Sequence, residues 1–153
     1  MMSKSTFVYV TYIRSTPDKV FKALTDPEIT RQYWGHNNVS DWKPGSSWEH
    51  RRTSNGNVDI VGQVVEAKAP SRLVITWASP DSPDSRSRVT FDIESAAEMV
   101  KLTVTHDDLE AGSGMDKGIR HGWPLVLSSL KSYLEAGRVL YAPWYEKKEA
   151  ASA

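Results

Sequence analysis

Residues 118–137, GIRHGWPLVLSSLKSYLEAG, decide the fold class because they predict the one helix long enough to cover a sheet. At about 100° per residue, the large apolar side chains other than Leu125 fall on a stripe roughly 120° wide. Pro124 falls on the opposite, polar side. Since the stripe continues across Pro124, we expect a single helix over about 118–136, ended by Gly137. The stripe consists of Ile119, Trp123, Val126, Leu127, Leu130, Tyr133 and Leu134.

The residues before this helix alternate between apolar and polar over a long antiparallel pattern. Residues 89, 91 and 93 on one strand, and 100, 102, 104 and 106 on the next, give a sheet with one apolar face. Such a face needs a cover, and 118–136 is the only candidate long enough. The expected strands are 38–42, 46–53, 57–67, 71–78, 86–94 and 98–106.

The N-terminal part predicts a strand followed by two short helices. Residues 6–13, TFVYVTYI, are β-branched or aromatic at both alternating positions, so we expect a strand covered on both faces. Thr16 before Pro17 is a helix start signal, and Asp26 before Pro27 repeats it. The second helix is expected to end near Gly35.

Composition predicts one domain over residues 1–153, with its core at about 6–138, an apolar extension at 139–146 and disorder at 147–153. The formal net charge of +0 argues against a nucleic-acid partner. The absence of cysteine excludes disulfides and thiolate metal sites. No run of about 18 apolar residues and no signal peptide is found, so we expect a cytoplasmic protein without a membrane partner. No cofactor or metal is expected.

Several motifs resemble one known family over about residues 6–138. They are TYIRSTPDKVFKALTDPE (11–28), YW (33–34), SDWKPG (40–45), GQVVE (62–66), RLVITW (72–77), TVTH (103–106) and GW…LK…LE from 122 on. They are similar to the activators of heat-shock-protein-90 ATPase and their homologues, in the START-like or SRPBCC superfamily with polyketide cyclases and the birch pollen allergen. The resemblance implies an α+β helix-grip fold: a curved antiparallel sheet of six to seven strands around a long C-terminal helix.

The resemblance also implies a cavity between sheet and helix, which in many relatives takes apolar ligands. Rigid tryptophan walls suit a flat apolar ligand, although large aromatic side chains also fill the core of a strongly curved sheet. Alternation further places His50 and Arg52 on the face of Trp48, unless a register slip exchanges the two faces. The candidate cavity residues are Trp34, Trp48, His50, Trp77, Phe91, His106, Trp123, Leu127 and Leu130.

His106 is the one catalytic candidate. Its place on the apolar face suits an acid or base working with Asp59 or Glu66; an imidazole that only bonds a loop carbonyl is the alternative and is favoured. His106, Asp107 and Asp108 are too close in sequence to converge on one metal.

Three functions follow as alternatives: a binder of a small apolar or aromatic molecule, a co-chaperone that stimulates a chaperone ATPase, and a cyclase-like or hydratase-like enzyme using His106. A noncatalytic role is favoured over an enzyme. The apolar extension at 139–146 is compatible with a homodimer. Gly118 and Gly122 thin the first half of the long helix, so we expect the cavity entrance there, beneath the loop 110–117.

Overall fold

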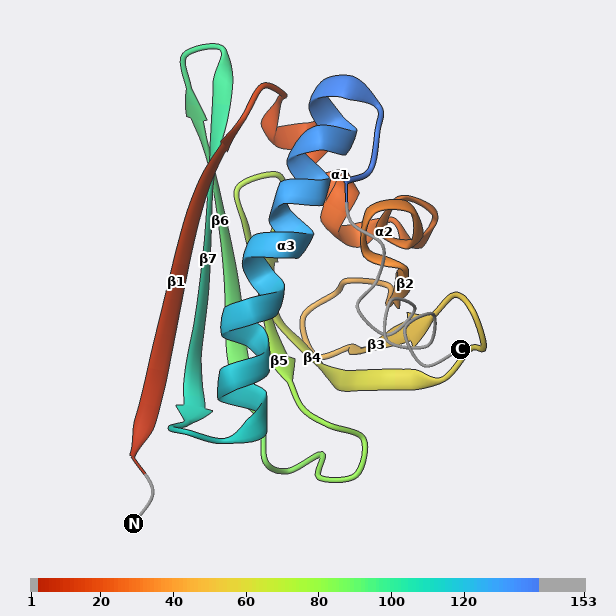
Figure 1. Cartoon of the computed structure of the whole chain (residues 1–153), viewed down its shortest axis with the longest axis vertical. Helices are drawn as coiled ribbons and strands as arrows, with labels where there is room; N and C mark the ends of the chain where they lie inside the picture. Colours follow the sequence, from red (N-terminus) through yellow and green to blue (C-terminus); the bar gives the residue numbers. More distant parts are fainter. Residues whose placement is uncertain (1–2, 141–153) are drawn as a thin grey trace.

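The computed structural model describes residues 3–140, which form one antiparallel sheet and three helices. The sheet has the order β1-β7-β6-β5-β4-β3-β2, and α3 lies along one face of it with α1 and α2 beside the helix (Figure 1). The strands are β1 Lys4–Ile13, β2 His36–Val39, β3 Ser47–Arg52, β4 Val58–Lys68, β5 Arg72–Trp77, β6 Ser87–Ala96 and β7 Met99–Glu110; the helices are α1 Pro17–Thr25, α2 Pro27–Trp34 and α3 Gly114–Ala136. The α+β helix-grip arrangement is confirmed, with seven strands in the described part of the chain.

The two short helices begin and end where the sequence predicts. The Thr16 side chain accepts a hydrogen bond from the Lys19 amide at the start of α1, and Pro17 is the first helical residue. Asp26 caps α2 in the same way. Gly35 ends α2 with φ 75°, a left-handed conformation that glycine adopts without strain. The chain therefore turns directly from α2 into β2.

The long helix α3 starts four residues earlier than predicted. Ser113 caps it by accepting a hydrogen bond from the Asp116 amide, and Gly137 ends it with φ 70°. Gly114 and Gly118 have low helix propensity, so the sequence pattern did not predict this first turn of the helix. The helix continues through Pro124 as predicted, so the expected loop at 110–117 is helical in its second half.

The prediction that β1 is covered on both faces was wrong. β1 is an edge strand paired with β7, and its outward side chains Val8, Val10 and Tyr12 are 55%, 42% and 44% exposed. Their alternate neighbours face the helix, because α3 covers only one side of the sheet. β-branched and aromatic residues suit the pleated strand itself, whether or not the outer face is covered.

The inner face of the sheet has the predicted side chains. Val89, Phe91 and Ile93 of β6 are buried, as are the alternate residues of β7 from Val100 to His106. The packing of α3 on the sheet is concentrated on β1 and β7, while α1 and α2 support it from the side. The first half of α3 therefore leaves room on the side of β2 to β5.

Candidate functional site: an aromatic cavity with a polar end

A cavity of about 580 Å³ lies between the first half of α3 and the β2 to β5 side of the sheet. A volume of this size suits a small organic ligand. Sheet residues and the end of α2 form one wall, and one face of α3 forms the other. The cavity is lined by Trp34, His36, His50, Asp59, Ile60, Trp77, Gly114, Met115, Gly118, Ile119, His121, Gly122, Trp123 and Val126.

Two helix glycines contribute empty space to the cavity. A Cβ atom built on Gly118 or Gly122 would have no heavy atom within 4 Å. Gly118 and His121 are exposed although they line the cavity, whereas Trp34 and Trp77 opposite them are buried. The exposed lining residues thus gather at the start of α3, the end of the helix where the sequence places the entrance.

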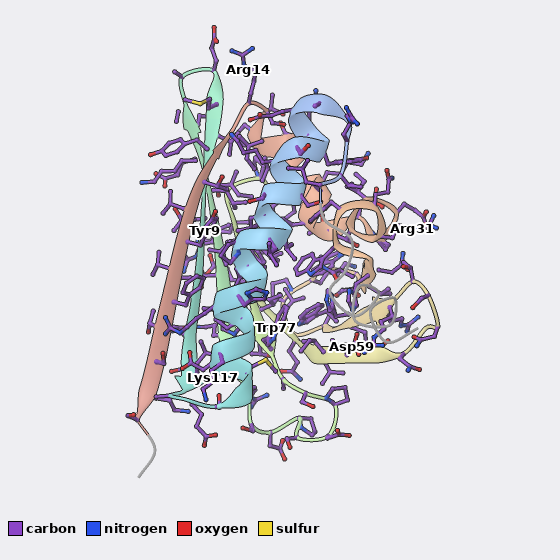
Figure 2. The ribbon with its side chains drawn as sticks, viewed as in Figure 1. Tyr9, Arg14, Arg31, Asp59, Trp77 and Lys117 are labelled. Atoms are coloured by element: carbon purple, nitrogen blue, oxygen red, sulfur yellow. The ribbon has the colours of Figure 1, made fainter. Side chains whose placement is uncertain are left out.

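Three tryptophans form the apolar wall and pack on one another. Ring centroids are 6.4 Å apart for Trp34 and Trp77, 5.5 Å for Trp34 and Trp123, and 5.4 Å for Trp77 and Trp123. The Trp77 Nε1–H donates to the Met115 sulfur at 3.3 Å, which ties β5 to α3. Figure 2 shows Trp77 beside the first half of α3, with Asp59 on the β4 side of the space. Mutual packing and the hydrogen-bonded indole donors of Trp77 and Trp123 give a rigid wall.

The end of the cavity beside Trp34 is polar, and its two histidines are buried. The His36 and His50 rings stack with centroids 3.7 Å apart and planes within 6°. His36 Nε2–H donates to Asp59 Oδ2 at 2.8 Å, and Arg52 Nε–H donates to the same oxygen at 2.7 Å. His50 Nδ1–H donates to Asn38 Oδ1 at 2.5 Å. The stacked imidazoles and their hydrogen-bond partners form a polar patch beside Trp34 and Trp77.

Burial disfavours the protonated form of both stacked imidazoles. Desolvation lowers the pKa of His36, opposed by the hydrogen bond from its ring to Asp59. Desolvation also lowers the pKa of His50, well below its usual value, and positive charge on His36 would lower it further. A charged pair of parallel rings at 3.7 Å is therefore disfavoured, and His50 is an uncharged hydrogen-bonding group.

His106 is fully buried and both of its ring nitrogens are paired. Trp123 Nε1–H donates to His106 Nδ1 at 3.1 Å, so Nε2 carries the proton, which it donates to Ser87 Oγ at 2.7 Å. Ser87 Oγ–H in turn donates to the Trp77 carbonyl at 3.1 Å. Burial lowers the pKa of His106 to about 4. This chain of bonds joins β5, β6, β7 and α3 and leaves neither nitrogen for a substrate.

The acids considered for His106 lie elsewhere. Asp59 bonds to His36 and Arg52, and Glu66 pairs with Arg72 and Lys68. The structure therefore gives no support to an acid–base pair at His106.

Four of the nine predicted cavity residues line the cavity: Trp34, His50, Trp77 and Trp123. The other five are buried in the surrounding core and do not line it: Trp48, Phe91, His106, Leu127 and Leu130. Phe91 stands edge-on to Trp123 at 5.8 Å, and Trp48 lies 5.5 Å from Trp77, so both support the wall from behind. Leu127 and Leu130 lie on the second half of α3, beyond the glycines that open the cavity.

The sequence did not identify His36, and it suggested Asp59 only as a partner of His106. β2 starts at His36, two residues before the predicted start, because Gly35 turns the chain at once. Asp59 lies in a bulge of β4, where Arg51 pairs with Val58 and His50 with Ile60. A bulge redirects a side chain, so simple alternation does not predict its direction.

Metal-binding clusters and membrane-spanning helices are the two remaining candidates among residues 3–140. No group of three or more histidine, aspartate or glutamate side chains there could hold a metal ion. None of the helices described is long and apolar enough to cross a membrane.

Solved structures similar to this chain share its fold. A dimeric Aha1 from Colwellia psychrerythraea is 21% identical, with a TM-score of 0.75 over 87% of this chain and 98% of that one. An Hsp90 activator from Plasmodium falciparum is 25% identical, with a TM-score of 0.72 over 84% and 95% of the two chains. CalU16 from Micromonospora echinospora is 20% identical, with a TM-score of 0.69 over 86% and 77%. No curated protein matches the chain significantly.

The sequence profile described as "Activator of Hsp90 ATPase homolog 1-like protein" matches residues 14–135. This range runs from the end of β1 to the last turn of α3 and includes every residue that lines the cavity. Because the match covers most of the chain, the protein belongs to the activator of Hsp90 ATPase homolog 1-like family.

Proposed function

We propose that this protein binds a small, flat apolar or aromatic molecule in the cavity, with no catalytic step. The observation that carries the proposal is the volume of about 580 Å³ between Trp34 and Trp77 on one side and Gly118, Gly122 and Trp123 of α3 on the other. Burial of apolar ligand surface supplies roughly 25 cal/mol per Å² before the costs of association. The mutually packed indoles are already ordered, so little further ordering opposes binding.

A screen of thermal stability tests this proposal. Fatty acids, sterols and flat aromatic compounds are added separately, and the midpoint of unfolding is followed for each. A ligand that binds only the folded state raises the midpoint. We expect the flat aromatic compounds to give the largest rise. If no class raises the midpoint at saturating concentration, the proposal is wrong.

Leucine in place of Gly122 is expected to weaken aromatic binding at least about tenfold, because its side chain would occupy space now open to the ligand. Quenching of tryptophan fluorescence by 2-naphthol measures the affinity. The control is Lys117→Leu, which adds an apolar side chain at an exposed position of α3 that does not line the cavity (Figure 2). Equal affinity in the two variants would contradict the placement of the ligand beside Gly122.

A co-chaperone function is the second candidate, and the family membership favours it. The Hsp90 activator from Plasmodium falciparum supports it further, being similar over 84% of this chain. The test is the ATPase rate of Hsp90 with and without this protein. An increase that saturates with added protein supports the candidate, and an unchanged rate removes it.

Homodimer formation is a related prediction. The solution structure of Aha1 from Colwellia psychrerythraea is a dimer, and the row of Val8, Val10 and Tyr12 on β1 offers an exposed apolar face. The apolar extension at 139–146 lies almost wholly outside the described residues. Light scattering measures the mass in solution, and a monomer at high concentration would contradict the prediction.

A further inference from the structure

The polar end of the cavity contains, on a buried residue, one imidazole nitrogen without a hydrogen-bond partner in the described part of the chain. His50 is 4% exposed and lines the cavity, and its Nδ1–H is used by Asn38 Oδ1. Nε2 has no hydrogen-bond partner among residues 3–140. We propose, resting on the function proposed above, that the ligand is a hydroxylated aromatic whose phenol-type hydroxyl donates a hydrogen bond to His50 Nε2.

The hydrogen bond to Asn38 determines whether the other ring nitrogen of His50 donates or accepts a hydrogen bond. A neutral imidazole has one N–H donor and one acceptor nitrogen. Since Nδ1 donates to Asn38 Oδ1, Nε2 presents a lone pair and accepts. Protonation of Nε2 would place a charge in a desolvated stack 3.7 Å from the His36 ring. The group that meets this nitrogen must therefore be a donor, and it keeps its proton.

Charge at the same end excludes an anionic ligand. Asp59 lines the cavity beside the two imidazoles, and Arg52 is already bonded to its Oδ2. A fatty-acid carboxylate or a phenolate would approach that carboxylate and has no proton to give to His50. A neutral hydroxyl is not repelled by the Asp59 carboxylate, and it has a proton to donate to His50.

The tryptophans next to His50 favour a flat aromatic ring as the part of the ligand that carries the hydroxyl. The His50 centroid lies 4.8 Å from Trp34 and 5.7 Å from Trp77, so an acceptor nitrogen and two aromatic walls converge on one space. A ring that carries the hydroxyl would lie against the indoles while its oxygen reaches Nε2. Stacking on rigid aromatic side chains favours a flat ring over a flexible chain.

The experiment compares 2-naphthol with 2-methoxynaphthalene, which has the same rings but no hydroxyl hydrogen. Calorimetric titration of the full chain is expected to show 2-naphthol binding about tenfold more tightly, the value of one buried hydrogen bond. In His50→Phe the preference disappears, while 2-methoxynaphthalene binds as in the wild type. Lys117→Phe, at an exposed position of α3 that does not line the cavity, is the control and keeps the preference.

The outcomes separate this inference from the proposed function. Binding of neither compound refutes both. Equal binding of the two compounds by the wild type, or a preference that survives in His50→Phe, refutes the role of His50 alone. If His50→Phe does not fold, ¹⁵N spectra of the His50 imidazole in the wild type test the inference instead. We expect the Nδ1–H tautomer and a shifted Nε2 signal with 2-naphthol; an Nε2–H tautomer, or an unmoved signal at saturation, overturns the inference.

Discussion

Alanine in place of Gly62 is expected to lower the free energy of unfolding by about 3 kcal/mol, because overpacking at this site cannot be relieved by a side-chain movement. A Cβ on Gly62 would overlap the carbonyl oxygen of Thr76 in β5 and lie 2.5 Å from Trp48 Nε1. These two atoms are joined by a hydrogen bond of 2.8 Å, so the added methyl group breaks it or separates β4 from β5. Denaturant unfolding measures the loss.

The matched control is Gly118→Ala. Gly118 lies within α3, its Cβ would meet open space, and its φ is not positive. Alanine there is expected to raise stability by up to about 1 kcal/mol, since it favours the helix. If Gly62→Ala unfolded at the wild-type denaturant concentration, the close contact between β4, β5 and Trp48 would be refuted.

Acid is expected to destabilise the protein through His106. Its folded-state pKa of about 4 lies below the ordinary value of 6.5, so the unfolded chain takes up the proton first as pH falls. The stability that His106 contributes is complete above pH about 6.5, declines below that and is lost as pH falls through about 4. The shift corresponds to about 3 kcal/mol.

His106→Gln isolates this contribution. The glutamine amide can accept from Trp123 Nε1 and donate to Ser87 Oγ, but it does not titrate. Because burial also lowers the pKa of His36 and His50, the wild type and the variant both lose stability in acid. Chemical denaturation at pH 7 and pH 4 is expected to show a loss about 3 kcal/mol larger in the wild type. Equal losses would mean that His106 is protonated in the folded protein.

Much of the fold is predictable from local signals. Thr16 before Pro17, Asp26 before Pro27 and the left-handed Gly35 and Gly137 act within a few residues, and the structure has each of them in place. The exposed face of β1 was not predictable in this way. Alternation reports which side chains share a face, but whether that face is covered depends on where α3 packs.

The candidate site likewise has residues that the sequence predicts and residues that only the fold reveals. Trp48 and His50 alternate in β3, and their burial agrees with the predicted face. The position of Asp59 beside His36 could not be predicted, since a bulge in β4 directs the side chain there. His106 was identified as a buried polar residue, but its partners Ser87 and Trp123 come from other elements, and only the folded chain reveals that both ring nitrogens are occupied.

The central claim is that the cavity holds a flat aromatic molecule between Trp34 and Trp77 on one side and the first half of α3 on the other. Titration of the ¹⁵N-labelled protein with 2-naphthol, followed by amide and indole chemical shifts, tests it most directly. We predict saturable shifts at the indole of Trp77 and the amides of Gly118 and Gly122, with unchanged signals on the outer face of β1 at Val8 and Val10. An absence of saturable shifts, or shifts gathered on the outer face of β1, would contradict the claim.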